Sequence, residues 1–310
     1  MNEVSLRSIL CPVDFSEQSR HALRLAQAIA QRNQSRVTVV SAIDPLLAEA
    51  AKSRLGLDLA KSDTEPALRE FVAATSHDGT AWLASGSVDV KVGKAEDVIL
   101  DAASRTSADL IVMGTHGLGG IRKWVLGSTT ERVLRRTPVA VLAVPPPVAS
   151  AAPTAPSPAQ EAGPVLMATD FSETAARALR WAASLARESG SPLLIVHVIE
   201  PIVVASRWEA YVERPSEARL AEARTQLQEL AKQSAAAPSS QCLVEVGRPA
   251  DTIASVAEAR RAGMIVMGLV SGPGTLGARP GSIAYRVLCL APTPVLVVPP
   301  QEAVQSSQPQ

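Results

Sequence analysis

Residues 114–128, GTHGLGGIRKWVLGS, decide the fold of this chain. The stretch follows an apolar run at 110–113, which predicts a buried strand, and it precedes a helical pattern at 129–136. Its five glycines allow positive φ and a close approach of the backbone to a ligand. Ser128 and Glu131 match a capping box that would begin the helix. A strand, a glycine-rich loop and a capped helix in this order present backbone N–H groups to a phosphate.

Strands and helices alternate on both sides of this stretch. Apolar or alternating runs predict strands at residues 8–13, 36–43, 81–92, 110–113 and 139–144. Helices are predicted after the first, third and fourth strands, with Asp14 or Ser16 as the N-cap of the first one. After the second strand, residues 46–59 are weakly helical and residues 65–75 indicate a helix, and together they predict only a crossover. The apolar/polar alternation at 87–92 favours a place near the sheet edge. This order predicts a parallel sheet with right-handed crossovers.

The second half of the chain repeats the first. The sequence DFSE at 14–17 returns at 170–173, and IVMG at 111–114 returns at 265–268. Repeated motifs in one order indicate a tandem duplication. We therefore predict a first domain at 1–146, a Pro/Ala-rich linker at 147–163, a second domain at 164–300 and a disordered tail at 301–310.

Composition narrows the class of protein. Thirty Lys and Arg balance thirty Asp and Glu, so the chain lacks the positive charge of a nucleic-acid or anionic-membrane binder. No apolar run approaches the roughly 20 residues of a membrane span, and the first residues do not resemble a signal peptide. We expect a soluble, cytoplasmic protein. Cys11, Cys242 and Cys289 lack disulfide or metal-ligand spacing, so we expect buried thiols and no metal site.

The spacing Gly114-x2-Gly117-x9-Gly127-Ser128 resembles the nucleotide-binding signature of the universal stress protein family. The resemblance includes the DFSE sequence and covers each half once. It implies an α/β, Rossmann-like fold with two tandem doubly wound five-stranded parallel sheets of order 3-2-1-4-5. It also implies a nucleotide at the carboxyl ends of strands one and four, which is the switch point of such a sheet.

The resemblance implies ATP as the ligand, with or without Mg²⁺. Ribose and phosphates would lie on backbone N–H groups near the start of the last helix, and adenine near the ends of the first, second and fourth strands. The residues implied are Pro12, Val13, Asp14, Ala42, Met113, Gly114, Gly117, Gly127, Ser128 and Thr129. Simpler roles stay open, since the glycines could only form turns and Asp14 could only cap a helix. Arg122 and Lys123 could screen phosphate charge or only be solvated.

The second copy departs from the signature. It reads Gly268-x2-Ser271-x9-Gly281-Ser282, two prolines remove backbone donors, and Tyr285 stands where the first copy has Glu131. Asp170 and Val198 remain from the adenine side. We predict a weaker second site, or none, formed by these residues.

Three classes of function remain. The first is an ATP-binding stress-response regulatory protein that acts through nucleotide-dependent contacts with an unidentified protein partner or a second copy. No catalytic residue is recognised, so any ATPase activity would be slow. The second is a nucleotide-independent scaffold that pairs the terminal strands at 139–144 and 295–298, in a homodimer or within one chain. A nucleotidyl-transfer enzyme would need a motif such as His-x-Gly-His, which neither copy has.

Overall fold

The structure is a computed structural model, and it describes residues 4–76, 86–115, 126–146, 163–205, 210–213, 215–232, 239–269 and 282–300. The first half contains β1 (Ser8–Pro12), α1 (Glu17–Asn33), β2 (Arg36–Ile43), α2 (Pro45–Leu55), the π-helical segment η1 (Ala60–Thr64), α3 (Glu65–Thr75), β3 (Ser87–Val92), α4 (Ala95–Arg105), β4 (Leu110–Gly114), α5 (Ser128–Arg136) and β5 (Ala140–Val144). The second half contains β6 (Val165–Thr169), α6 (Glu173–Ser189), β7 (Leu193–Ile199), β8 (Ile202–Ala205), β9 (Ala210–Glu213), α7 (Glu217–Lys232), β10 (Ser240–Val246), α8 (Pro249–Ala259), β11 (Met264–Gly268), α9 (Ile283–Leu290) and β12 (Val295–Val298).

Each half has the predicted strand order. The first half is ordered β3-β2-β1-β4-β5 and the second β10-β7-β6-β11-β12, with parallel pairing inside each half. This confirms the α/β fold with a 3-2-1-4-5 sheet in each half. Strand β3 lies at the sheet edge, as its alternating pattern predicts.

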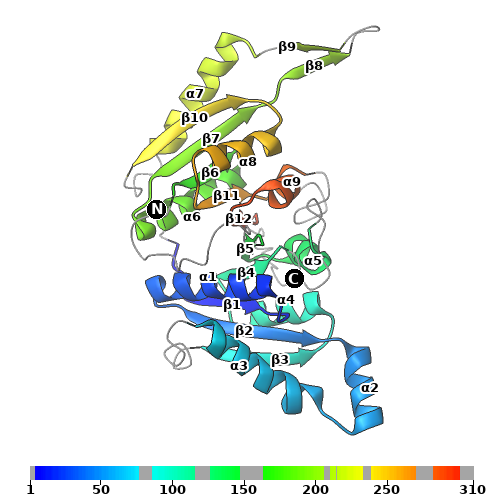
Figure 1. Ribbon diagram of the computed structural model, residues 1–310. Helices are drawn as coiled ribbons and strands as arrows, with labels where there is room; N and C mark the ends of the chain where they lie inside the picture. The colour runs from blue at the N-terminus through cyan, green and yellow to red at the C-terminus, as the bar shows by residue number, and fades with distance from the viewer. Residues whose placement is uncertain are drawn as a thin grey trace, which may run out of the picture.

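The two five-stranded sheets are joined into one. Strand β12 pairs antiparallel with β5, with Leu296 opposite Leu142, and the result is a single ten-stranded sheet (Figure 1). Every residue of both strands is buried, so leaving either strand as a free edge would expose apolar side chains and unpaired backbone groups. The sequence left open whether the terminal strands pair within one chain or between two copies. In this structure they pair within the chain.

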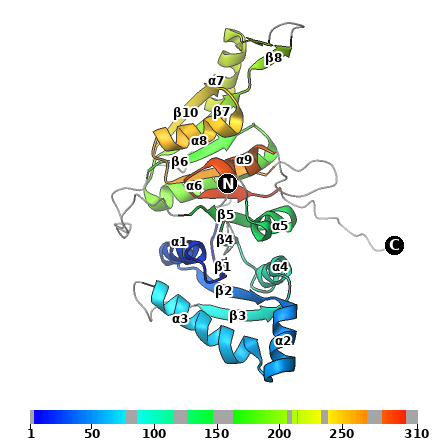
Figure 2. The same ribbon diagram turned by 45° about the vertical axis from the view of Figure 1, so that its right-hand side comes forward.

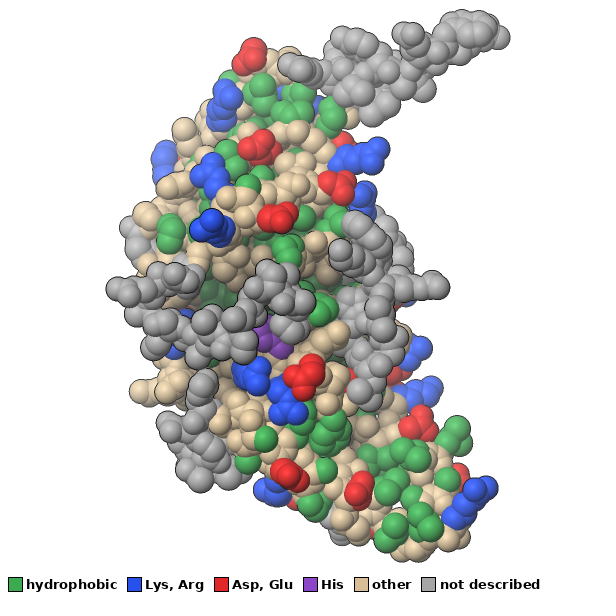
Figure 3. All heavy atoms as spheres, in the orientation of Figure 1, with side chains coloured by type: hydrophobic (Ala, Val, Ile, Leu, Met, Phe, Trp, Pro, Cys, Tyr) green, Lys and Arg blue, Asp and Glu red, His purple; other side chains and the backbone are tan. Residues whose placement is uncertain are grey.

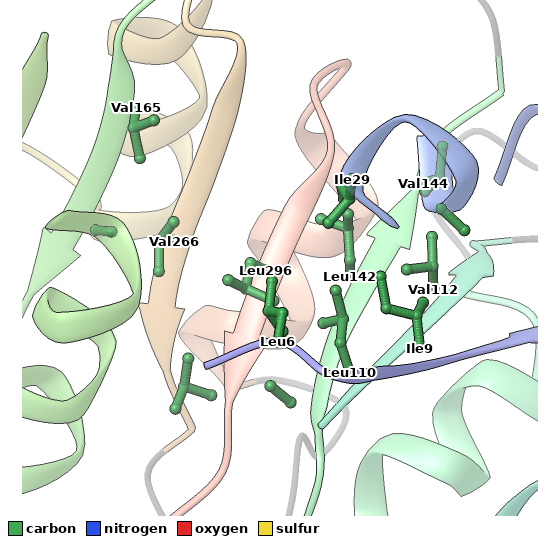
Figure 4. Packing of buried hydrophobic residues seen from close by; sticks show 14 of the residues in the cluster. Leu6, Ile9, Ile29, Leu110, Val112, Leu142, Val144, Val165, Val266 and Leu296 are labelled. Atoms are coloured by element: carbon green, nitrogen blue, oxygen red, sulfur yellow. The ribbon is translucent and has the colours of Figure 1, made fainter. Parts of the chain in front are cut away.

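Helices cover both faces of the sheet, as the turned view shows (Figure 2). Helices α1, α3, α6 and α7 pack on one face, and α4, α5, α8 and α9 on the other. Each face carries one apolar cluster that contains residues of both halves. In Figure 4, Leu296 lies close to Leu142 and Leu6 in the cluster on the first face. The two halves therefore share their core at the seam, where β5 meets β12. The predicted domain boundaries stay a prediction, because residues 147–162 lie outside the described part of the chain.

Two features of the fold differ from what the sequence indicated. A hairpin of β8 and β9 stands between β7 and α7, where the first half has α2 and η1. Of the three cysteines, only Cys11 is buried, and burial raises the pKa of its thiol. The expectation is wrong for Cys242, which is exposed because its strand β10 is the last in the sheet, and Cys289 is only half-buried. The predicted tail at 301–310 lies outside the described residues.

Candidate functional site

The candidate site lies where β1 and β4 end side by side. Strand β1 pairs with β2 on one side and with β4 on the other, so the chain reverses its direction of sheet growth at this point. Pro12 and Met113 are the last or next-to-last residues of these strands, and the β1–β2 ladder extends by one bond, in which the Val13 amide donates to the Val40 carbonyl at 2.8 Å. In doubly wound sheets, ligands bind at such a switch point.

Asp14 forms the turn that follows β1. Its Oδ1 accepts hydrogen bonds from the Ser16 amide at 3.1 Å and from the Ser16 hydroxyl at 2.5 Å. Ser16 is the N-cap of α1, because its Oγ accepts from the Ser19 amide at 3.1 Å. Of the two cap candidates the structure therefore selects Ser16, and Asp14 orients the cap residue. Phe15 between them has a φ of 64°, a strained left-handed conformation that is enriched at functional sites.

The glycine-rich stretch is described at its two ends only. Residues 116–125, which include Gly117, Arg122, Lys123 and Trp124, lie outside the described residues. The ends are close together, since the Gly127 amide donates to the Thr115 carbonyl at 2.7 Å. Thr115 in turn donates its amide to the Val144 carbonyl of β5 at 2.9 Å. The start of α5 is thereby held against the end of β4.

The predicted capping box of Ser128 and Glu131 is wrong. Helix α5 begins one residue earlier than the box requires, so Gly127 is the N-cap residue and no side chain caps the helix. Ser128 is in the first helical position and is exposed. The Glu131 carboxylate instead forms an ion pair with Arg135 one turn later. The first amides of α5 are therefore left without a side-chain acceptor, which is the arrangement that binds anions at helix N-termini.

Several contacts outside the glycine signature hold α5 in place. The buried Thr130 hydroxyl donates to the Gly114 carbonyl at 2.8 Å. Arg132 pairs with the buried Glu96 of α4 at 3.2 Å, and Arg136 pairs with Asp97 at 2.6 Å. The sequence analysis did not identify Thr130. Its position two residues after Ser128, on the face of α5 nearest the preceding strand, could have indicated this contact.

The same corner in the second half is built differently. Ser172 caps α6, and Asp170 accepts from the Ser172 amide at 3.0 Å, so the first turn is repeated. At α9, however, Ser282 is the N-cap, and its hydroxyl accepts from the Tyr285 amide at 3.2 Å. Val198 and Gly268 lie at the ends of β7 and β11, whereas Ser271 and Gly281 lie outside the described residues.

The first turns of α5 and α9 meet at the seam. Burial raises the pKa of the Tyr285 hydroxyl, and the nearby Glu131 carboxylate raises it further, while the Leu126 amide lowers it. Burial also raises the pKa of Cys289, one turn further along α9, and the Leu126 amide again acts against this rise. Leu126 directly precedes the N-cap of α5. The end of the first glycine-rich stretch is therefore in contact with the second half.

Comparison with models of known protein families shows which family the chain belongs to. The model of the Universal stress protein family matches residues 5–145 and again 162–299. The chain belongs to the Universal stress protein family. A universal stress protein of Thermus aquaticus is 36% identical over 146 residues, which are 44% of this chain and 98% of that protein. Universal stress protein Sll1654 of Synechocystis is 29% identical over 142 residues, 46% of this chain and 87% of that protein.

Solved structures match the whole tandem arrangement. A putative universal stress protein of Pseudomonas aeruginosa has a TM-score of 0.66 at 20% identity and covers 95% of this chain and 94% of its own. A universal stress protein of Archaeoglobus fulgidus has a TM-score of 0.62 at 22% identity, with 94% and 97% covered. At this identity the likeness concerns the fold. Among the helices that the structure describes, none is both long and apolar enough to span a membrane.

Proposed function

We propose that this member of the family is a stress-response regulatory protein whose first half binds ATP, with or without Mg²⁺. The observation that carries the proposal is the uncapped N-terminus of α5, which lies beside the β1/β4 switch point. Backbone amides and the helix dipole at such a terminus attract phosphate. In this proposal Gly114, Gly117, Gly127, Ser128 and Thr129 hold the phosphates and ribose. Pro12, Val13, Asp14, Ala42 and Met113 surround the adenine.

The second half is proposed to bind nucleotide weakly or not at all. Its counterpart helix, α9, has one first-turn amide already occupied by the Ser282 hydroxyl. Tyr285 replaces a carboxylate there, and its side chain is directed into the contact with the first half. The residues that a ligand would still find are Asp170, Val198, Gly268, Ser271, Gly281 and Ser282.

Regulation would pass through the seam. Phosphate bound at α5 alters the electrostatic surroundings of Leu126 and Glu131, and both lie near Tyr285 of the second half. The terminal strands are already paired with each other, so the proposal does not require a second copy of the chain at that edge. The sequence has no motif that supplies a base to activate water, and we expect hydrolysis of ATP to be slow if it occurs.

A nucleotide-independent scaffold is the second candidate, and helix α2 favours it. Leu46, Leu47 and Leu55 of this helix are 78%, 60% and 69% exposed, and Leu57 beyond it is 44% exposed. Hydrophobic side chains gather over this region in the space-filling view (Figure 3). Exposed apolar patches of this kind mark contacts with other proteins. The patch would serve a partner whether or not nucleotide is bound.

Isothermal titration calorimetry with ATP tests the proposal directly. We expect one ATP per chain for the unaltered protein. Gly127→Val places a side chain at the start of α5 and should reduce affinity at least tenfold, whereas the matched substitution Gly281→Val in the second half should leave it unchanged. Two equivalent sites would contradict the asymmetry, and an absence of binding would favour the scaffold.

A further inference from the structure

Strand β3 ends the ten-stranded sheet on the side of the first half. It pairs with β2 over Ser87–Val92, and among the strands that the structure describes it pairs with no other. Both ribbon views show it as the last strand at its end of the sheet (Figures 1 and 2). The outer edge of such a strand presents unpaired backbone N–H and C=O groups, which are a template for pairing with another strand.

The side chains of β3 alternate between its two faces. Val88 and Val90 pack against the apolar cluster on the face that carries α1 and α3. Asp89 lies on the opposite face, where Arg105 of α4 donates to its carboxylate at 2.6 Å. Lys91 lies on the same face as Asp89, approaches its carboxylate only to 3.9 Å, and has a side chain that is 53% exposed. One face of β3 is therefore apolar, and the other carries a carboxylate and an ammonium two residues apart.

A second copy of this strand fits β3 in few registers. In an antiparallel pair, residues directly opposite each other lie on the same face of the sheet. A two-fold axis that relates two copies of β3 must therefore pass where one residue lies opposite its own copy. The choice of that residue then sets every other pair.

With the axis at Val90, the side chains on both faces are complementary. Asp89 of each copy lies opposite Lys91 of the other. On the second face Val90 lies opposite Val90, and Val88 lies opposite Val92, whose side chain is 50% exposed in the single chain. Cross-strand pairs of opposite charge and of β-branched residues stabilise a sheet. An axis at Asp89 or at Lys91 would instead place like charges opposite each other.

The other end of the sheet lacks this complementarity. Strand β10 pairs with β7 and with no other described strand, so its outer edge is open as well. In the sequence of β10, SQCLVEV, Glu245 is the one charged residue. No two-fold pairing of β10 with itself can therefore place opposite charges against each other. The charge pattern distinguishes β3 from an open edge in general.

We propose that β3 is a homodimerisation edge, at which two copies of this chain pair antiparallel about a two-fold axis at Val90 and join their sheets. The proposal does not depend on ATP binding, since β2 separates β3 from the β1/β4 switch point. An interface that uses the same strand of both copies is closed, whereas pairing of β3 with β10 of a second copy would continue into a filament.

Sedimentation equilibrium of the full chain tests the proposal. We expect a dimer for the unaltered protein at about 100 μM. Lys91→Asp and, separately, Asp89→Lys each place like charges opposite each other at two positions of the homodimer. Each variant should weaken dimerisation about tenfold or more. The matched control is Glu245→Lys at the open edge of β10, which should leave dimerisation unchanged.

Mixing the two variants tests the register. In a mixed pair the introduced lysine lies opposite the introduced aspartate, and the native Lys91 of one chain lies opposite the native Asp89 of the other. The mixture should therefore regain the dimer that each variant alone loses. Asp89→Lys also removes the partner of Arg105, so thermal unfolding of each variant checks that it is folded.

Val92→Glu keeps the test independent of the Asp89 variant. This side chain is half exposed in the single chain, so the substitution should leave the fold intact. In the dimer it would place a carboxylate opposite Val88, and it should weaken dimerisation about tenfold.

Four results would overturn the proposal. The first is an unaltered chain that is still a monomer at about 100 μM. The second is a dimer that Lys91→Asp and Val92→Glu leave unchanged, because the interface would then lie elsewhere. The third is a mass that grows beyond the dimer with concentration, which is the behaviour of a filament. The fourth is a mixture of folded charge variants that stays monomeric.

Discussion

The first turns of α5 and α9 occupy equivalent places in the two halves and differ in how their amides are satisfied. Helix α5 begins after Gly127 with no side-chain cap, whereas Ser282 caps α9. The two serines align in the sequence, Ser128 with Ser282, yet only the second is an N-cap. A one-residue difference in where a helix begins thus decides whether a hydroxyl serves the helix or stays available for a ligand.

The comparison also shows that the same motif residue can make different contacts in the two halves. Gly268 recurs in the half with the degraded signature, and its packing against Thr174 accounts for it without any nucleotide. Gly114 has the same place in the first half, where its carbonyl accepts from Thr130. Glycine at this position is therefore poor evidence for a phosphate site by itself.

The largest effect is expected at Gly268. Gly268→Ala should lower the free energy of unfolding by about 2 kcal/mol, because the new Cβ would press on the Thr174 backbone, which cannot turn away. Adding Thr174→Ala removes the Cγ2 contact but not the backbone contact, so it should restore only part of the loss. Chemical denaturation measures both. Full tolerance of Gly268→Ala would reopen a ligand role for this glycine.

An intermediate effect separates the two aligned serines. Ser282→Ala should lower the free energy of unfolding by about 1 kcal/mol, the usual value of an N-cap, and should leave ATP affinity unchanged. Ser128→Ala should leave stability within about 0.5 kcal/mol, since an exposed hydroxyl is removed, and should weaken ATP binding. Denaturation and calorimetry on both variants test this. The reverse pattern would contradict the assignment of the caps.

The smallest effect is expected at His21, which aligns with Arg177 of the second half. Burial lowers the pKa of His21 below its ordinary value near 6.5, and the Arg24 charge lowers it further. The unfolded chain therefore binds a proton at His21 more tightly than the folded chain does. As a result, the free energy of unfolding should fall as the pH drops below about 6.5. Arg177 stays charged and adds no such dependence.

The His21 prediction is measured as the slope of stability against pH. His21→Gln should flatten the slope between about pH 6.5 and 5, whereas Arg177→Gln should leave it as it was. An unchanged slope for His21→Gln would place the titrating group elsewhere.

The sequence by itself determined the alternation of strands and helices and the duplication. It also placed β3 at the edge, because local periodicity records which face of an element is buried. The order 3-2-1-4-5 and the candidate site residues came from the family signature. The positions of the site residues in the nucleotide pocket remain a prediction.

Tertiary structure decided what depends on neighbours distant in the chain. The antiparallel pairing of β5 with β12 merges two sheets, and no local pattern distinguishes it from pairing with a second copy. The start of α5 is fixed by Thr115, Thr130 and the end of β4, which overrides the cap that the S-x-x-E spacing favours. In each case the deciding atoms lie far apart in sequence, and only folding brings them together.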